Sequence, residues 1–246
     1  MKAMIYTEYG SPDALQLKEV ATPQPGQGEV LVKVHATGLN AADRYKLSGA
    51  PFIVRLIGDG LRQPKHPILG ADVAGVVEAA GRGVTRFRPG DAVYGDLSGS
   101  GWGGLAEYVA APEHVWALKL AGISFEQAAA VPMAAVTALQ GLRDKGQIRA
   151  GQRVLVYGAS GGVGTFAVQI AKALGAEVTA VCSSRNVEMA RALGADYVLD
   201  YTRENFAQNG RRYDLVLAVN GYRPIGDYQR VLAPDGVYVM VGGTMK

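Results

Sequence analysis

The stretch Arg153-Val-Leu-Val-Tyr-Gly-Ala-Ser-Gly-Gly-Val-Gly164 predicts the fold of the second half of the chain. It begins with a short apolar run rich in β-branched residues, which is typical of a buried parallel strand. Four glycines follow, and apolar residues then recur as far as Leu174 with the spacing of one helical face. Gly175 stands where a residue with positive φ commonly ends a helix. Strand, glycine-rich turn and helix together predict the first half of a dinucleotide-binding βαβ unit.

Two glycine registers compete within this turn. The strict pattern Gly-x-Gly-x-x-Gly/Ala fits only from Gly162 to Ala167, which begins deep in the helical stripe. We therefore prefer Gly158-x-x-Gly161-x-x-Gly164, with one extra residue in the turn. The predicted pyrophosphate-binding residues are Gly158, Ala159, Ser160, Gly161, Gly162, Val163 and Gly164. The alternative is a turn that only packs a helix on a strand, and the βα pattern that follows favours the cofactor site.

The composition is that of a globular protein, with 48% hydrophobic and 19% charged residues. A net charge of +3, dispersed along the chain, gives no reason to expect nucleic acid as a partner. One cysteine, Cys182, excludes intrachain disulfides and zinc sites built from several thiolates. The longest apolar run, residues 128–136, contains a proline and is too short to span a bilayer. Because the N-terminal residues also lack the apolar core of a signal peptide, we expect a cytoplasmic protein without membrane contact.

Residues 1–121 predict a β-rich domain that carries the substrate site. Short alternating runs are separated by clusters of glycine and proline, as in a compact barrel-like sheet. The predicted strands are Met1–Tyr6, Leu15–Glu19, Glu29–Ala36, Val73–Ala80, Ala92–Tyr94 and Ala106–Ala110. A short helix is predicted over Asn40–Leu47, with Asn40 as its N-cap.

Residues 122–246 predict a parallel, doubly wound sheet, because strands alternate there with helices. The predicted strands are Val154–Tyr157, Glu177–Cys182, Tyr197–Leu199, Leu215–Val219 and Val237–Val241. The predicted helices are Ser124–Ala130, Met133–Asp144, the one after Gly164, Val187–Leu193 and Ile225–Val231, with a weak one near Asn205.

Motifs along the whole chain resemble the medium-chain dehydrogenase/reductase superfamily. They are Gly38-Leu-Asn-Ala-Ala-Asp43, His66-Pro-Ile-Leu-Gly-Ala-Asp-Val-Ala-Gly-Val-Val77, Pro89-Gly-Asp-Ala-Val93, Ala106-Glu-Tyr108 and the glycine turn. The branch most similar is the zinc-independent quinone oxidoreductases. The resemblance implies an α/β protein in which a GroES-like β-barrel-type domain precedes a Rossmann domain.

The departures from zinc alcohol dehydrogenases bear on the chemistry. Asn40 stands where those enzymes place a zinc-binding cysteine, and Ala71 where they place a zinc-binding histidine. His35, His66 and His114 show no ligand spacing and are interpreted as surface or packing residues, so we expect no metal. Without a metal to stabilise an alkoxide, hydride transfer is easier to a conjugated acceptor, such as a quinone or an α,β-unsaturated carbonyl. Such a reaction needs alignment and hydrogen bonds to the developing oxyanion.

The resemblance implies that Asn40 and Tyr45 line the catalytic site. Tyr45 carries a neutral donor that could deliver a proton or hold an enolate. Both residues have a structural alternative, since Asn40 could serve only as a helix cap and Tyr45 only in packing. Asp43 is expected to orient the turn between them.

NADP(H) is the predicted cofactor. The second strand of the βαβ unit ends in Cys-Ser-Ser-Arg-Asn186 with no acid before Glu188, whereas an acid there would bind the ribose of NAD. We expect Ser183 and Arg185 to bind the 2′-phosphate. Tyr201 matches a tyrosine beside the adenosine phosphate in the quinone reductase branch, and Thr137 a position beside the nicotinamide; an ordinary residue after a strand and helix packing are the alternatives. Val241 and Gly242, at the end of the fifth strand, complete the predicted cofactor-binding set.

The length leaves several alternatives open. Members of the superfamily usually continue past the fifth strand, so the chain is expected to be a natural short form, a fragment or a truncated reading frame. A metal-free alcohol or aldehyde reductase and a non-catalytic NADPH-binding protein are the alternative functions, and a homodimer is one option for assembly. The acceptor site is expected in loops 50–67 and 96–104, where Trp102 is either a pocket residue or a core or exposed one. The apolar insertion Phe52, Ile53, Val54, Leu56 and Ile57 is either a packing plug or a pocket wall.

Overall fold

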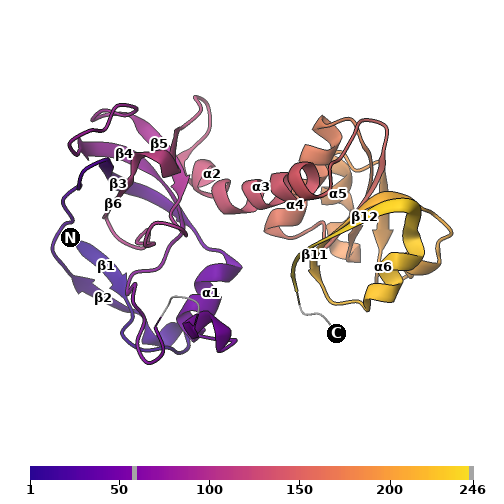
Figure 1. The fold of residues 1–246 in the computed structure, drawn as a ribbon, viewed down its shortest axis with the longest axis horizontal. Helices are drawn as coiled ribbons and strands as arrows, with labels where there is room; N and C mark the ends of the chain where they lie inside the picture. The colour runs from indigo at the N-terminus through magenta and orange to yellow at the C-terminus, as the bar shows by residue number, and fades with distance from the viewer. Residues whose placement is uncertain (57–59, 244–246) are drawn as a thin grey trace. The chain divides into compact units, whose positions relative to one another are not determined.

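The computed structural model describes residues 1–56 and 60–243, which divide into two compact units, Met1–Met133 and Ala134–Lys246 (Figure 1). The predicted boundary at 121/122 falls a few residues before α2 (Phe125–Ala129), which packs on strands of the first unit. In the part of the chain that is described, no helix combines the length and the apolar character needed to cross a membrane.

The first unit is built on an antiparallel sheet in the order β6-β3-β4-β5-β7. Its elements are β3 (Glu29–Gly38), α1 (Ala41–Ser48), β4 (Asp72–Ala80), β5 (Ala92–Asp96), β6 (Tyr108–Pro112) and β7 (Trp116–Leu118). A separate hairpin-like pair, β1 (Lys2–Ile5) with β2 (Gln16–Glu19), is joined to the rest through isolated bridges. Alternate valines of β3, β4 and β5 point inward and pack on Phe87 and Trp116, which makes the core of this unit.

Sequence patterns predicted every strand of the first unit except β7. This strand has three residues, and two of them, Ala117 and Leu118, are exposed, so no alternation was visible. Its register on β5 places Trp116 opposite Gly95, where a β-carbon would lie 2.4 Å from the Val115 carbonyl oxygen. The absence of a side chain at Gly95 therefore allows the short edge strand to approach.

The second unit is a parallel sheet in the order β10-β9-β8-β11-β12. The strands are β8 (Arg153–Tyr157), β9 (Glu177–Cys182), β10 (Tyr197–Asp200), β11 (Tyr213–Gly221) and β12 (Leu232–Gly243). The helices are α3 (Pro132–Leu139), which begins just before this unit, α4 (Gly162–Ala173), α5 (Val187–Ala192) and α6 (Ile225–Val231). The weak helix predicted near Asn205 is a single 3₁₀ turn, Phe206–Gln208.

Helices cover both faces of this sheet, as a doubly wound fold requires (Figure 1). Alternate strand residues face opposite ways: Val154 and Val156 pack with buried residues of α4, while Leu155 packs with Phe206 and Tyr228. The helix predicted as Met133–Asp144 is α3 followed by a wider π-helical turn, Gln140–Lys145. The predicted α/β fold, an antiparallel domain followed by a Rossmann-like sheet, is confirmed.

Candidate functional site

The glycine turn after β8 leaves no room for side chains at two positions. Gly158 has φ +75°, and a β-carbon there would lie 2.3 Å from the Val219 carbonyl oxygen. A β-carbon on Gly164 would lie 2.2 Å from the Gly158 carbonyl oxygen. Gly161 is the N-cap of α4 and has a β-region backbone. The geometry thus follows the register Gly158, Gly161, Gly164 and places Gly162 in the first helical turn.

This turn lies where ligands bind in doubly wound sheets. The strand order reverses between β8 and β11, and the crevice outside the carboxyl ends of the strands at that point is the usual site. The N-terminus of α4, a helix of 12 residues, points its unpaired N–H groups toward the turn. Backbone N–H groups and the positive end of a helix favour an anion, so the turn is suited to a pyrophosphate.

The end of β9 differs from the sequence interpretation in one respect. Asp200, at the end of the neighbouring β10, lies at the same edge as Ser183 and Arg185. Its carboxylate accepts hydrogen bonds from the Ser184 hydroxyl at 2.5 Å and the Thr202 hydroxyl at 2.7 Å, with Arg203 at 3.5 Å. The Ser184 bond first, then the Thr202 bonds, hold the pKa of Asp200 below its usual range. An acid is therefore present at this edge, but its oxygens are already occupied.

Of the two adjacent serines, only Ser183 stays clear of Asp200. Its hydroxyl oxygen accepts a hydrogen bond from the Asn186 side chain at 3.1 Å. Arg185, two residues on, is exposed. Ser183 and Arg185 thus lie together at the end of β9, as the sequence indicated.

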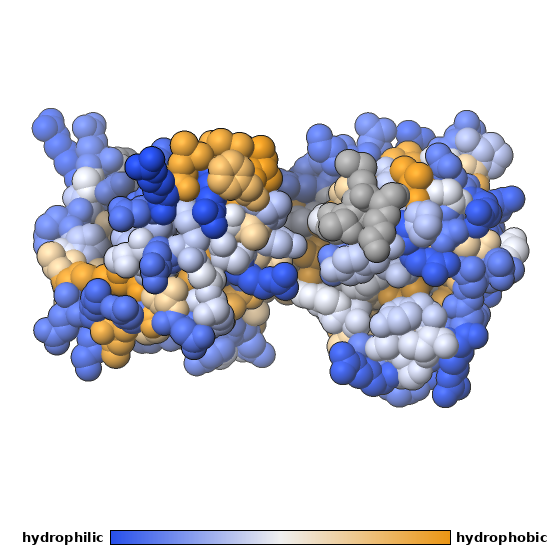
Figure 2. All heavy atoms as spheres, turned by 90° about the horizontal axis from the view of Figure 1, so that it is seen from below, coloured by the Kyte–Doolittle hydropathy of each residue, from blue (hydrophilic) through white to orange (hydrophobic). Residues whose placement is uncertain are grey.

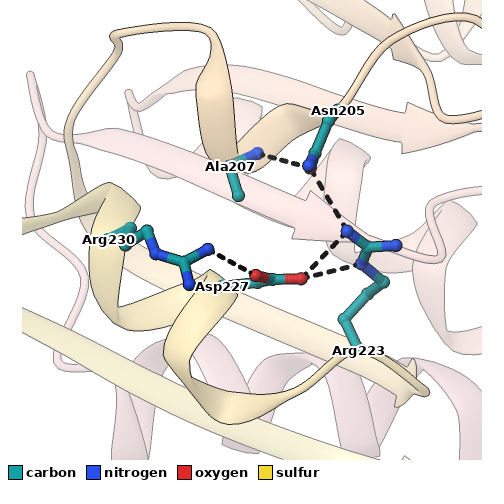
Figure 3. Close-up of polar contacts among 5 residues, drawn as sticks. All are labelled: Asn205, Ala207, Arg223, Asp227 and Arg230. Carbon is teal, nitrogen blue, oxygen red and sulfur yellow. Dashed lines mark hydrogen bonds and ion pairs between the residues drawn. The ribbon is translucent and has the colours of Figure 1, made fainter.

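A cavity of about 290 Å³ opens at this edge of the second unit. Its lining combines aromatic, cationic and polar side chains: Tyr157, Tyr201, Thr202, Arg203, Glu204, Asn205, Phe206 and Arg223. Figure 3 shows how Arg223 is held: its guanidinium donates to Asp227 at 2.9 Å and to Asn205 Oδ1 at 3.4 Å. Asp227 also accepts from Arg230 at 2.7 Å. The cavity therefore presents a positioned cation beside aromatic rings, which suits a flat ring bearing phosphate.

The remaining predicted cofactor residues lie in different elements of the same unit. Thr137 is half-buried on α3. Val241 pairs with Val219 across β12 and β11 and packs against the core, and Gly242 follows with φ +66°. Neither Thr137 nor Gly242 lines the cavity beside Tyr157 and Arg223.

In the first unit, Asn40 is tied to a buried carboxylate. Asn40 caps α1, and its side-chain Nδ2 donates to Asp72 Oδ2 at 3.1 Å. Asp72 is 1% exposed and also accepts from the Met133 backbone N–H at 3.0 Å. Asp43 accepts from the backbone N–H groups of Asn40 at 2.8 Å and Gly70 at 2.9 Å. The predicted role of Asp43 in shaping this turn agrees with these bonds.

Burial changes the titration of both carboxyl groups. Desolvation raises the pKa of Asp72 to about 6, against the hydrogen bonds from Asn40 and Met133 that lower it. Desolvation also raises the pKa of Asp43. Asp96, which pairs with Asp72 across β4 and β5, adds like-charge repulsion to both.

Beside Asn40 lies an apolar cavity of about 630 Å³. Its lining combines seven leucine, methionine or proline residues with one glycine and five polar residues: Met4, Gly10, Ser11, Pro12, Leu15, Leu39, Asn40, Asp43, Arg44, Leu47, Ser48, Leu69 and Leu105. Tyr45 is absent from this lining and is 42% exposed, with the Arg44 guanidinium 5.7 Å from its ring centre. The structure therefore brings Asn40 to the cavity and leaves Tyr45 on the outer face of α1.

Two predicted acceptor-site features fall outside this cavity. Trp102 is buried, with the Lys46 ammonium 4.8 Å above its ring. In the insertion, Phe52, Ile53 and Leu56 are exposed, so the packing-plug interpretation is wrong for them; Ile57 lies outside the described residues. Figure 2 shows apolar residues gathered on the surface of the first unit.

The three histidines do not gather. His35 stacks on Phe125 with the ring centres 4.4 Å apart. Within residues 1–56 and 60–243, no group of three or more His, Cys, Asp or Glu side chains is arranged to hold a metal ion.

Sequence reasoning missed Asp72, Asp200 and Arg223. Asp72 bonds to partners 32 and 61 residues away, so no local spacing marks it. Arg223 and Asp200 each have an opposite charge nearby in the chain, Asp227 and Arg203, so a local signal was present for both. Asp200 also directly follows an apolar run, and polar residues at the carboxyl ends of parallel strands gather at one edge.

Family models match both units. A model of the alcohol dehydrogenase GroES-like domain matches residues 26–121, and a model described as zinc-binding dehydrogenase matches residues 162–246.

Three curated relatives align over most of the chain. The 2-methylene-furan-3-one reductase of Solanum lycopersicum is 38% identical, over 100% of this chain and 63% of the relative. The chloroplast envelope quinone oxidoreductase homolog of Arabidopsis thaliana is 39% identical, over 96% and 73%. The chloroplastic NADPH-dependent alkenal/one oxidoreductase of Arabidopsis thaliana is 36% identical, over 90% and 58%. The chain thus spans less than two thirds of the length of the first and third.

Among solved structures, the quinone oxidoreductase from Coxiella burnetii superposes with a TM-score of 0.82 at 28% identity. The match covers 100% of this chain and 84% of that one.

Proposed function

Because this chain belongs to the medium-chain dehydrogenase/reductase superfamily, in its zinc-independent quinone oxidoreductase-like branch, we propose that it reduces quinones or α,β-unsaturated carbonyls with NADPH. The observation that carries this proposal is the pairing of Asn40 with Asp72 beside a large apolar cavity. An amide donor next to an apolar wall suits an acceptor that has a hydrophobic body and one carbonyl oxygen.

The residues of the second unit fit NADPH. The glycine turn and the first turn of α4 would hold the pyrophosphate. Gly158 and Gly164 let the turn pack tightly against the Val219 and Gly158 carbonyl oxygens, and the backbone of Gly161 and Gly162 stays open at the start of the helix. Ser183 and Arg185 would bind the 2′-phosphate. Asp200 does not oppose this assignment, because Ser184, Thr202 and Arg203 already contact its carboxylate. Tyr201 and Arg223, which line the cavity at this edge, would contact the adenosine half.

The chemistry asked of the protein itself is modest. The bound cofactor supplies a hydride. The first unit then has to align the acceptor and stabilise the negative charge that develops on its carbonyl oxygen. Asn40 Nδ2 carries a second N–H that Asp72 does not take, and we assign it to that oxygen. Because Tyr45 is exposed on α1 and lies outside the cavity lining, we propose it as the proton donor only through an intervening water.

Two measurements on the purified chain test this proposal. NADPH binding is followed by the change in its fluorescence, and turnover by the loss of NADPH absorbance with a panel of quinones and enones. We expect binding, and absorbance loss that depends on the acceptor. Binding without loss in any acceptor would favour a non-catalytic nucleotide-binding protein, and no binding would refute the cofactor assignment.

We also propose that the protein acts in the cytoplasm, and a homodimer stays one option for its assembly. The single cysteine, Cys182, is buried and unpaired, in agreement with a reducing compartment. Fractionation of the producing cells and light scattering of the purified protein test location and assembly separately.

A further inference from the structure

Asp72 joins two parts of the first unit through one carboxylate. Oδ2 accepts from Asn40 Nδ2, and Oδ1 accepts from the Met133 backbone N–H at the start of α3. Gly38, which pairs with Asp72 across β3 and β4, makes this possible: a β-carbon there would lie 2.5 Å from the Ala129 carbonyl oxygen. The close approach of α2 to β3 thus delivers the Met133 N–H to Asp72.

An ionised carboxylate can only accept hydrogen bonds, whereas an amide has a donor end and an acceptor end. While Asp72 is ionised, Asn40 must therefore turn its NH₂ group toward Asp72. A protonated carboxyl group has a donor of its own and can pair with either end of the amide. The charge on Asp72 therefore favours the orientation in which the NH₂ group faces it, and the capping box, in which the Asn40 side chain accepts from the Asp43 N–H, agrees with this orientation.

We propose that Asp72 is a positioning residue that orients the Asn40 amide, so that its second N–H is presented to the acceptor oxygen. This inference rests on the proposed function, in which Asn40 is the donor to that oxygen. It adds to the site a buried residue that bonds to Asn40.

The surroundings of Asp72 make this orientation sensitive to pH. Burial raises the pKa of Asp72 to about 6, and the charged groups that act on it, Asp96 on β5 and Asp43 on α1, are both acidic. On β3, the Thr37 hydroxyl donates to the backbone oxygen of Asp72. At the start of α3, the group that contacts the Asp72 carboxylate is the Met133 N–H. Among the described residues no cation pairs with it. Turnover should therefore fall below about pH 6 as the amide loses its fixed orientation.

Kinetics of Asp72→Asn test the proposal. We expect kcat/KM at neutral pH to fall by roughly ten- to a hundredfold while NADPH affinity stays unchanged, and the acid limb near pH 6 to disappear. Asp72→Glu, which keeps the carboxylate, should recover part of the rate and the limb. In an Asn40→Ala background the same Asp72→Asn change should have little further effect. Full additivity of the two substitutions would overturn the proposal.

Asp96→Asn is the matched control. It removes a neighbouring negative charge without touching Asn40, since its carboxylate accepts only from the Ser98 N–H among the described hydrogen bonds. We expect an unchanged rate at neutral pH and an acid limb moved to lower pH. A rate loss equal to that of Asp72→Asn would show that charge alone, and not orientation, matters, and would overturn the proposal.

A readout without turnover separates this inference from the proposed function. The side-chain amide signals of Asn40 in ¹⁵N–¹H spectra, identified by their loss in Asn40→Ala, should titrate near pH 6 in the parent protein and not in Asp72→Asn. Signals that do not titrate would overturn the inference. If they titrate but no acceptor is reduced, the proposed function fails while the coupling of the two side chains stands.

Discussion

The proposed contacts to the 2′-phosphate come from single side chains at the carboxyl edge of the second sheet. Arg185 is exposed and lies beside Ser183, and the acid that might have repelled a phosphate, Asp200, is bonded to Ser184 and Thr202. Hydrogen bonds to charged groups contribute more to binding than neutral ones. Most of the preference for a 2′-phosphate should therefore depend on Arg185.

Arg185→Gln should raise the Kd of NADPH by roughly ten- to a hundredfold and leave that of NADH within about twofold, because only NADPH has the 2′-phosphate. Fluorescence titration with both nucleotides measures this. Arg191→Gln, which removes the same charge from the far end of α5, where Arg191 pairs with Glu188, should change neither Kd. An equal loss in both variants would mean that general charge, and not a contact, sets the affinity.

The sequence predicted Ser183 and Arg185 as site residues because they follow the end of a predicted strand, and the family resemblance implied Asn40. It could not indicate Asp72, because the Met133 N–H that bonds its carboxylate lies 61 residues away in the chain. The Arg223–Asp227 pair spans only four residues and is visible in the sequence, but the cavity that Arg223 lines is formed only by the fold.

At the scale of elements, α1 is fixed at its start by Asp43. The carboxylate accepts the N–H of Asn40 at the helix N-cap and the N–H of Gly70, which has φ +94°. The second bond joins the helix to the segment before β4. Loss of Asp43 would leave a buried donor without a partner, and that costs more than the loss of an exposed bond.

Asp43→Ala should lower the free energy of unfolding by about 2–4 kcal/mol. Urea unfolding measures it. Asp91→Ala is the comparison, since Asp91 accepts the Arg88 N–H in an exposed turn, and its loss should cost less than about 1 kcal/mol. Equal losses would contradict the view that Asp43 holds α1 to the rest of the unit.

The glycine turn makes a second prediction at this scale. Gly164→Ala would place a β-carbon 2.2 Å from the Gly158 carbonyl oxygen, so α4 would have to move away from β8. We expect a loss of several kcal/mol, at least about 3, or failure to fold. Gly161→Ala meets the same oxygen at 3.6 Å and should stay within about 1 kcal/mol of the parent protein. Thermal unfolding compares them, and similar Tm values would refute the packing role of Gly164.

For the whole molecule, the buried Asp72 should make the free energy of unfolding depend on pH. Burial raises the pKa of Asp72 from 3.8 to about 6, so the folded state binds its proton more tightly than the unfolded state. The stability that this proton provides is fully present below pH 3.8 and is lost as pH rises through about 6.

Between pH 4.5 and 7.5 the parent protein should therefore lose about 2 kcal/mol relative to Asp72→Asn, which has no group to titrate there. Urea unfolding of both proteins at the two pH values measures the difference, in which the other titrating groups cancel. A difference that does not change with pH, or that changes in the opposite direction, would mean that Asp72 titrates normally.

The order of the two units and nearly all their strands followed from the sequence. Alternation of apolar and polar residues predicted the antiparallel strands, and apolar runs between glycines predicted the parallel ones. Strand β7 was not predicted, because its three residues, two of them exposed, are too few to show an alternating pattern. The cavity beside Asn40 also escaped, since its walls come from residues between Met4 and Leu105 that only the fold brings together.

The position of a labelled hydride in the product tests whether the protein reduces the conjugated double bond of its acceptor. The chain is incubated with NADPH that carries deuterium at the transferable position and with a simple enone, and the product is analysed by mass spectrometry and NMR. We expect a saturated ketone with deuterium on the β-carbon, since Asn40 is proposed to stabilise charge on the carbonyl oxygen while the hydride adds at the far end of the conjugated system. An allylic alcohol with deuterium on the carbonyl carbon would contradict it and identify a carbonyl reductase instead.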